Sequence, residues 1–455
     1  MKKNDKKNWL LRVNVMMFFA MIGVVAYPQG VADEMYQKGK ECYDKKDYKS
    51  AVEWYEVASG KGSKEAQCAL ANCYLDGKGV EKNAEKAVEM LIPLANEGVA
   101  DAQNIMGVCY YNGNVVEQNY SIAVEYFCKA AEHGEPWANY NLGVCYEYGK
   151  GVESDLKTAI KWYRIAADCY SHVGAQIKLA EIYKDVMQDE EQAVAWYRKA
   201  AEQGNAHGQY ALAYYMGFDE RETAKEWYEK SANQGYAPAQ VELGFLYYLD
   251  ENYAKAKEWL DKALAQNDSD AQYYMGLSYY EGKGVERDLK KAVEWWQKSA
   301  AQGETIAQYR LAECYYKGEG VKRDYKKAIE LCQKVMGREY LWYDVYGAPY
   351  MLAECYFYGR GVDQDYKEAV KWYEKTLDVH EECSIYLGCA QYKLGVCYEN
   401  GYGVAMSKED ALSYYESALY LGVGDVEEEL ELEKAYKRLA GKDFEWHGTI
   451  MVERK

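Results

Sequence analysis

Residues 276–303 read GLSYYEGKGVERDLKKAVEWWQKSAAQG, a glycine-rich loop followed by a segment with helical periodicity. A loop of this composition can cradle a phosphate, but such a loop is used once per nucleotide-binding domain and follows a strand. Here the glycine pair and its valine recur, each time after a helical pattern. The six copies begin at Gly77, Gly149, Gly282, Gly318, Gly359 and Gly401. We therefore interpret the loop as a connector between helices, and the chain as an array of repeats.

The helix before each connector shows a regular pattern of large and small side chains. It begins with an Ala-Gln pair, as at Ala271-Gln272, and a large apolar residue follows four positions after the alanine. The next residue is always Gly or Ala, and a tyrosine follows three positions later in nine of ten units. These positions share one helical face, and the small residue lets a neighbouring helix approach closely.

The helix after each connector is marked by an alanine that occurs in eleven segments, Ala292 among them. Four residues before that alanine stands a side chain that can accept hydrogen bonds from the free amides of a first helical turn. Only Glu220 departs from this rule. The predicted N-caps are Asp47, Asn83, Asn119, Asp155, Asp189, Asn252, Asp288, Asp324, Asp365 and Ser407.

The repeats divide the chain into four parts. Residues 1–32 precede the array, 33–62 form a half-matching hairpin, 63–422 hold ten complete units, and 423–455 contain a polar capping helix and a tail. One hairpin cannot bury its apolar face alone, so neighbouring hairpins must supply each other's core. The sequence therefore predicts an all-α solenoid of about ten to eleven antiparallel helix-turn-helix repeats.

Residues 1–32 are typical of an export signal. The basic stretch MKKNDKKNWLLR precedes the apolar stretch VNVMMFFAMIGVV, and Val24-Val25-Ala26 could serve as a cleavage site. This order is that of a secretory signal peptide, and the apolar segment is short for a membrane span. We expect an exported, periplasmic or envelope-associated protein. The alternative is an N-terminal anchor that stays uncleaved, with the array outside the membrane.

The charge of the chain limits its partners. It carries 73 acidic and 55 basic residues, for a net charge of −18. Nucleic acid is disfavoured as a partner because neutralising phosphates requires a basic face. Adhesion to an anionic membrane surface is disfavoured for the same reason, which leaves the leader as the only expected membrane contact.

With these residues in hand, the chain resembles the Sel-one-like repeat family, a branch of the tetratricopeptide-type solenoids. The pattern A-Q-x-x-L-G-x-x-Y-x-x-G-x-G-V-x-x-D-x-x-K-A-x-x-W recurs over nearly all of the chain past residue 32. The resemblance implies a right-handed superhelix, a tetratricopeptide-like hairpin at 33–62, and a role as an adaptor or scaffold. Many bacterial members look exported, which agrees with the leader. The resemblance names no partner.

No residue set in the sequence indicates catalysis, a cofactor or a metal site. Six cysteines occupy one repeat position, Cys73, Cys109, Cys145, Cys314, Cys355 and Cys397, which other repeats fill with Ile, Leu or Ser, so the position is interpreted as a core slot. The five histidines show no metal-ligand spacing. Ser154-Asp155-Leu156-Lys157 matches an S-x-x-K motif, but Asp155 is a predicted helix cap, so we interpret the match as coincidence.

Three positions on the first helices vary between units and lie off the recurring face, at spacings i, i+4 and i+7. In the later units they form a predicted aromatic stripe punctuated by acids. Its candidate partner-binding residues are Tyr273, Tyr280, Tyr309, Glu313, Tyr316, Tyr350, Glu354 and Phe357. Such a stripe on the concave surface would suit a peptide, because tyrosine offers contact area at low entropic cost. The alternative is that these rings pack between adjacent units.

The sequence favours a non-catalytic scaffold that binds a protein or peptide on the concave face of the array. An alternative is a carbohydrate-binding protein or enzyme of the cell envelope that stacks sugar rings on the aromatic stripe. A third possibility is a structural spacer that binds nothing through the stripe.

Overall fold

The computed structural model describes residues 29–441, except 114, 218–219, 338–344, 346, 379–383 and 425. The export signal predicted within 1–32 thus falls almost entirely outside the described residues, and so does the tail predicted after residue 441. The described part contains twenty-three α-helices and no strand. The predicted all-α fold class is confirmed.

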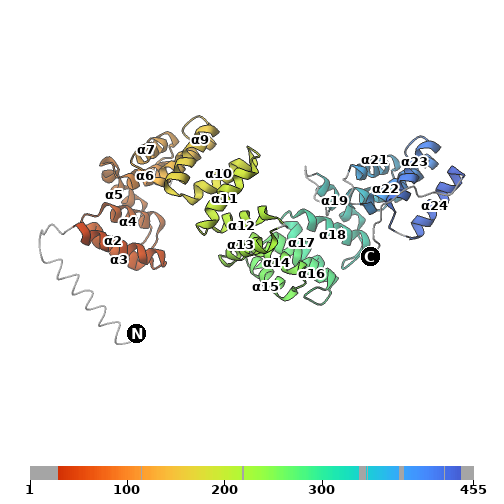
Figure 1. Ribbon diagram of the computed structural model, residues 1–455, viewed down its shortest axis with the longest axis horizontal. Helices are drawn as coiled ribbons and strands as arrows, with labels where there is room; N and C mark the ends of the chain where they lie inside the picture. The colour runs from red at the N-terminus through yellow and green to blue at the C-terminus, as the bar shows by residue number, and fades with distance from the viewer. Residues whose placement is uncertain are drawn as a thin grey trace. The chain divides into compact units, whose positions relative to one another are not determined.

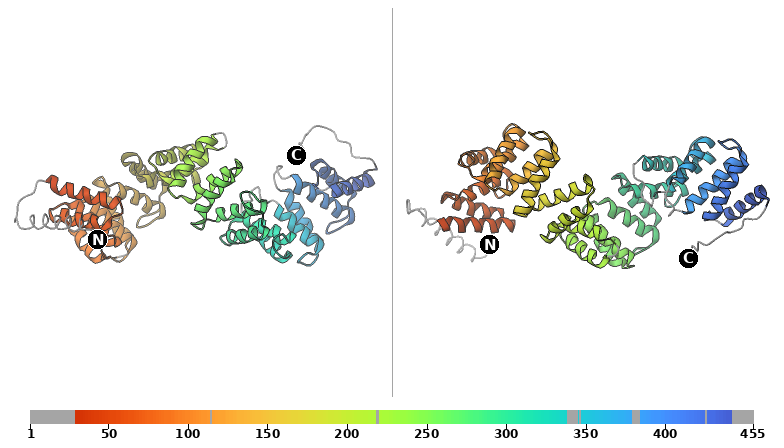
Figure 2. Two further views of the ribbon diagram at one scale, coloured as in Figure 1. Left: turned by 90° about the horizontal axis from the view of Figure 1, so that it is seen from below. Right: turned by 45° about the horizontal axis from the view of Figure 1, so that its top comes forward.

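The helices alternate between the two arms of successive antiparallel hairpins (Figures 1 and 2). The first arms are α2 Gln29–Asp44, α4 Lys64–Asp76, α6 Ala100–Asn112, α8 Pro136–Tyr148, α10 Val173–Asp185, α12 Ala206–Met216, α14 Ala237–Leu249, α16 Ser269–Glu281, α18 Thr305–Lys317, α20 Gly347–Tyr358 and α22 Ser384–Asn400. The second arms are α3 Tyr48–Gly60, α5 Ala84–Asn96, α7 Tyr120–Glu132, α9 Leu156–Arg164, α11 Glu190–Glu202, α13 Arg221–Asn233, α15 Tyr253–Leu264, α17 Leu289–Ala301, α19 Tyr325–Met336, α21 Tyr366–Leu377 and α23 Lys408–Leu421.

The chain divides into two compact units, residues 1–212 and 213–455. From α2 to α11 and from α13 to α24 each helix packs against the next along the chain, and first arms also touch each other, as α4 and α6 do in the first unit and α14 and α16 in the second. Each unit therefore has a continuous core shared between neighbouring repeats, as the nearest-neighbour logic of repeat proteins requires.

The glycine pair of residues 282–284 serves the architecture of the array. Gly282 ends α16 at φ 75°, and its N–H donates to the Ser278 carbonyl, so a left-handed residue closes the helix. Gly284, at φ 74°, lies against Tyr253, the first residue of the preceding second arm, where a Cβ would come within 2.8 Å of the Tyr253 Cβ. The next repeat uses Gly320 in the same way against Leu289. The second glycine thus lets the connector touch the backbone region of the previous hairpin.

The helix caps follow the sequence pattern closely. Asp288 accepts hydrogen bonds from the N–H groups of Lys290 and Lys291, both at 3.1 Å. The other nine predicted N-caps also accept a bond from their own first turn. Glu220 makes no such bond. Ser154 and Asp155 are accounted for here too: Asp155 caps α9, and the Ser154 hydroxyl donates to the Glu147 carbonyl.

Within each hairpin the small residue of the first arm accommodates a large side chain of the second. A Cβ on Gly276 would lie 2.5 Å from Trp296, whose indole is 1% exposed and donates to the Tyr273 carbonyl. The same contact recurs between Gly143 and Tyr163. The two arms can approach only because the first arm carries no larger residue there.

The repeated cysteine position is a core slot, as predicted. All six of its cysteines are at most 4% exposed, and every cysteine in the described part of the chain is a free thiol. Burial raises the pKa of Cys109 to about 11 and that of Cys145 to about 12. Such thiols resist ionisation and act as small apolar side chains.

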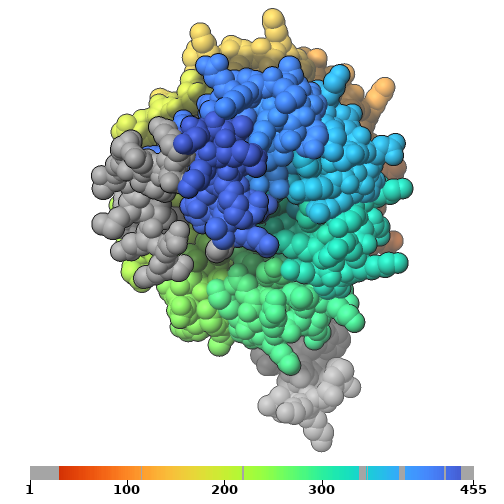
Figure 3. Space-filling model, turned by 90° about the vertical axis from the view of Figure 1, so that its right-hand side faces the viewer, coloured from red at the N-terminus to blue at the C-terminus, as the bar shows by residue number. Residues whose placement is uncertain are grey.

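The array ends on α24, Val426–Ala440, which packs against α23 of the last hairpin. Leu432, Ala435 and Tyr436 of α24 join Tyr415 and Leu419 in one core cluster. Figure 3 shows this helix in dark blue beside the final repeat. It supplies the apolar partner that a following repeat supplies elsewhere.

The caps yield a paired test. Replacing Asp288 by alanine removes two hydrogen bonds from the first turn of α17 and should cost about 1 kcal/mol of stability. Glu220→Ala is the matched control, because Glu220 occupies the same repeat position without a cap bond. Urea unfolding followed by circular dichroism should show a lower midpoint for the first variant alone. Equal midpoints for the two variants would contradict this account of the caps.

Candidate functional site

The side chains of the predicted aromatic stripe all belong to the second unit, where most of their surface is buried. Tyr273, Tyr309, Phe357 and Glu354 are buried, with exposures of 7%, 2%, 8% and 9%. The other four members, Tyr280, Glu313, Tyr316 and Tyr350, are half-buried. Little ring surface therefore remains for a ligand in the free protein.

The polar atoms of the stripe bond to neighbouring side chains. The Tyr280 hydroxyl donates to Glu319 at 3.1 Å, across to the next repeat. Arg360 donates to the Tyr316 hydroxyl at 2.6 Å, and Tyr373 donates to Glu354 at 2.6 Å. In the free protein the stripe joins adjacent repeats, and its role in binding a partner stays a prediction.

In α4 and α6, the position of Tyr273 and Tyr309 carries a smaller side chain. Tyr273 and Tyr309 stand two residues after the repeat alanine, where α4 has Cys68 and α6 has Asn104. Position six after that alanine is Asn72 in α4. Where large rings fill this face in the second unit, the first unit is left with open space.

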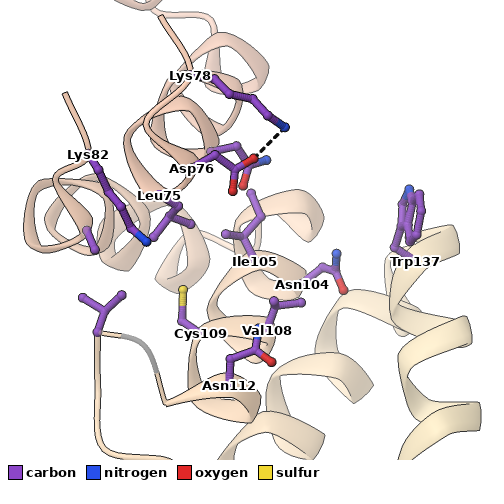
Figure 4. Close-up of a pocket in the computed structure, with 13 residues that line it drawn as sticks. Leu75, Asp76, Lys78, Lys82, Asn104, Ile105, Val108, Cys109, Asn112 and Trp137 are labelled. Carbon is purple, nitrogen blue, oxygen red and sulfur yellow. Dashed lines mark ion pairs between the residues drawn. The ribbon is translucent and has the colours of Figure 1, made fainter. Parts of the chain in front are cut away.

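That space is a cleft of about 760 Å³ on the first arms of the first unit. Its lining comes from α4, α6, the start of α5, their connectors and Trp137 of α8: Asn72, Leu75, Asp76, Lys78, Lys82, Ala84, Asn104, Ile105, Val108, Cys109, Asn112, Val115 and Trp137. Figure 4 shows Lys82 on one side of the cleft and Trp137 on the opposite side, with Ile105 and Val108 between them.

A smaller hollow of about 220 Å³ continues the cleft and shares Asn72, Asn104, Ile105 and Trp137 with it. Its other lining residues are Tyr36, Glu65, Cys68, Ala69, Asp101 and Glu135. The two together form one groove, which we call the first-unit groove.

Amide and indole groups give the groove its binding chemistry. Asn141 of α8 donates to the side-chain oxygen of Asn104 at 2.9 Å, which fixes the orientation of that amide. Each asparagine offers one donor group and one acceptor, as a peptide bond does. Trp137 is 57% exposed and is held edge-on against His172, with ring centroids 4.4 Å apart.

Carboxylates gather at the end of the groove beside Trp137. Burial, together with a hydrogen bond to Asp101 and the charge of Asp101, raises the pKa of Glu135 to about 7. Burial also raises the pKa of the Cys68 thiol, to about 12, with added effect from Asp101, Glu65 and Glu135. For both groups burial is the largest cause of the shift, and the neighbouring carboxylates add to it.

The opposite end of the groove carries basic groups. Lys78 forms an ion pair with Asp76 at 2.9 Å and donates to the Tyr43 hydroxyl at 3.0 Å. The ammonium group of Lys82 is directed toward the centre of the cleft (Figure 4). The groove therefore has carboxylates at one end and the ammonium group of Lys82 at the other, since Lys78 is already paired with Asp76.

The stripe predicted from the sequence lies in the second unit, whereas the open groove lies in the first unit, partly at the same repeat positions. The prediction selected α16, α18 and α20 because they carry aromatic side chains. In the structure these large rings fill the space on the face of the first arms. The available signal was the reverse: Cys68 and Asn104 are smaller than the tyrosines that other repeats carry two residues after the alanine. The exposed Trp137 lies at the start of α8 and is not part of the repeat pattern, so the pattern could not indicate it.

Neither catalysis nor metal binding is indicated by the described side chains. Among residues 29–441 as described, no group of three His, Cys, Asp or Glu side chains could hold a metal ion. Over the same residues, no helix has the length and apolar character needed to cross a bilayer.

Comparison with known proteins agrees with the repeat pattern. The sequence model of the family described as Sel1 repeat matches residues 30–63, 64–99, 100–135, 138–171, 173–205, 206–236, 237–268, 269–304, 305–334, 348–378 and 390–423. The chain belongs to the Sel1 repeat family. The first of these matches shows that the N-terminal hairpin is itself a Sel1 repeat.

A solved structure shares the fold. The structure of c5321, described as a protective antigen present in uropathogenic Escherichia coli strains and displaying an SLR fold, is 26% identical, covers 93% of this chain and 97% of that chain, and has a TM-score of 0.68. A Sel1 repeat protein from Oxalobacter formigenes is 30% identical, covers 67% of this chain and 86% of that chain, and has a TM-score of 0.45. No curated protein matches the chain. Sel1 repeat proteins are commonly protein-interaction scaffolds and are generally non-catalytic.

The acidic end of the groove makes stability depend on pH. Because the pKa of Glu135 is raised from 4.5 to about 7 in the folded protein, the folded state holds this proton more tightly than the unfolded state. The contribution of Glu135 to stability is therefore lost as the pH rises through that interval. The melting temperature should fall more between about pH 5 and about pH 8 in the wild type than in Glu135→Gln. Glu117→Gln, which removes an exposed carboxylate, is the control; a wild-type slope in the Glu135 variant would contradict the assignment.

Proposed function

We propose that this protein is a non-catalytic scaffold that binds a protein or peptide segment in the first-unit groove. The observation that carries the proposal is the open groove itself, about 760 Å³ in its larger part, at repeat positions that the second unit fills with tyrosines. The family's common role as an interaction scaffold agrees with this choice.

The lining suits an extended polypeptide. Ile105 and Val108 offer apolar contact on the floor, while Asn72 and Asn104 can satisfy the N–H and carbonyl groups of a bound backbone. A backbone group buried without such a partner would cost free energy, so paired amides favour a peptide over a purely apolar ligand.

The aromatic stripe of the second unit is a second proposed contact surface. Its contribution would come from the members that keep exposed area, Tyr280, Glu313, Tyr316 and Tyr350, since the remaining members are buried. Sugar stacking on the stripe is less well supported, because stacking needs a free ring face and these rings lie against other side chains. We further propose, from residues 1–32, that the array acts outside the cytoplasm.

The groove can be closed by imitating the second unit. Asn104→Tyr places a tyrosine at the position of Tyr273 and Tyr309, where the ring should fill the groove without disturbing the repeat core. Met406→Tyr is the matched control, since Met406 is 73% exposed in a connector far along the chain.

Affinity capture from lysate of the native host, with the tagged full chain, tests the proposal. Proteins retained by the wild type and by Met406→Tyr should be lost from Asn104→Tyr, after circular dichroism shows equal helix content. Equal retention by all three proteins would refute binding in this groove. Retention of the chain on insoluble cell-wall material, unaffected by Asn104→Tyr, would favour the carbohydrate alternative.

A further inference from the structure

Three repeats carry a basic side chain at one position on the first-arm face. Lys178, Arg310 and Lys393 each stand three residues after the repeat alanine. Lys178 pairs with Glu181 at 3.0 Å, Arg310 with Glu313 at 3.1 Å, and Lys393 with Glu428 at 3.2 Å. On these repeats the protein itself supplies a cation to the carboxylates near this face.

The groove repeats lack that cation. The same position holds Ala69 in α4, Ile105 in α6 and Asn141 in α8. The face nevertheless carries Glu65, Asp101 and Glu135. The nearby Lys64 and Lys78 pair instead with Glu97 and Asp76, at 2.8 and 2.9 Å.

Carboxylates that lie close together repel one another unless a proton or a cation joins them. Glu65 and Asp101 are exposed and Glu135 is half-buried, and in the described part of the chain the nearby lysines Lys64 and Lys78 pair with other carboxylates. The exposed indole of Trp137 borders the same hollow, and the face of an indole attracts ammonium and guanidinium groups. The carboxylates and the indole face are both suited to bind a cationic group of a ligand.

Building on the proposed function, we propose that the groove selects an extended peptide segment carrying a lysine or arginine, whose side chain enters between Trp137 and the carboxylates of Glu65, Asp101 and Glu135. Asn72 and Asn104 would bind the backbone of that segment. The occupant is a basic peptide rather than a free cation, because the acidic hollow opens into the larger, amide-lined part of the groove.

Lys82, at the other end of the groove, would favour one orientation of the bound peptide. Lys82 lies on the side of the cleft opposite Trp137 (Figure 4). A segment whose basic side chain lies beside Trp137 would bring its other end toward Lys82, where an acidic residue or a terminal carboxylate would be favoured.

The test measures binding of fluorescein-labelled nine-residue peptide pools to the full chain by fluorescence anisotropy. The pools are random except for a central lysine, arginine, glutamine or glutamate. The lysine and arginine pools should bind about tenfold more tightly than the glutamine pool at low salt, and the glutamate pool more weakly still. The difference should shrink as salt is added, because part of the groove is exposed to solvent.

Two variants test the residues. Asp101→Asn combined with Glu135→Gln should remove the preference for the basic pools, whereas Glu117→Gln combined with Glu132→Gln, which changes the net charge equally at exposed positions, should leave it. Asn141→Lys places a built-in cation at the position of Arg310 and should weaken binding of the lysine pool. Melting curves confirm that each variant is folded, and Asn141→Lys should melt no lower than the wild type.

Equal binding of all four pools, blocked by Asn104→Tyr, would overturn the charge preference and leave the scaffold function standing. Binding of no pool, or binding that Asn104→Tyr leaves intact, would overturn the inference. The scaffold function itself would be refuted only by the capture experiment. Spermine that displaces the lysine pool from the wild type at equal concentration would overturn a peptide occupant in favour of a small cation.

Discussion

The contact between a small residue on the first arm and a large side chain on the second is the constraint on which the array depends. Gly276 against Trp296, and Gly143 against Tyr163, set how closely two antiparallel helices can pack. Because this contact occupies one face of each first arm, the positions off that face are free to vary. Caps and glycine connectors then fix where each helix begins and how each hairpin meets the previous one.

The side chains at those positions distinguish the repeats of α4 and α6 from those of α16 and α18. Tyrosines at 273 and 309 are large enough to reach across to the neighbouring helix, so they bury themselves and complete the core. Cys68 and Asn104 at the same positions are too short to do so, and a groove remains. A repeat protein can therefore open a binding site by shortening side chains, without any change in its backbone pattern.

Charge at the first-arm face also differs from repeat to repeat. Where a lysine or arginine is built into the face, as at Lys178 and Arg310, a local carboxylate is paired. Beside Trp137 the carboxylates of Asp101 and Glu135 share a partly buried site instead, which raises the pKa of Glu135 to about 7. Carboxylates without a basic partner do not stabilise the fold. They are suited to bind a partner of opposite charge.

The sequence by itself determined the all-α repeat fold, the position of ten N-caps and the exception at Glu220, because these depend on spacing along one helix or one connector. It also identified the variable positions of the first arms. Only the tertiary structure decided which of them form a site, because whether Tyr309 or Asn104 leaves space depends on the side chains of the neighbouring repeat. Trp137 and Glu135 are candidate binding residues for the same reason. They line one hollow together with Asp101, which lies a full repeat earlier in the chain, and only the packing of the repeats brings the three together.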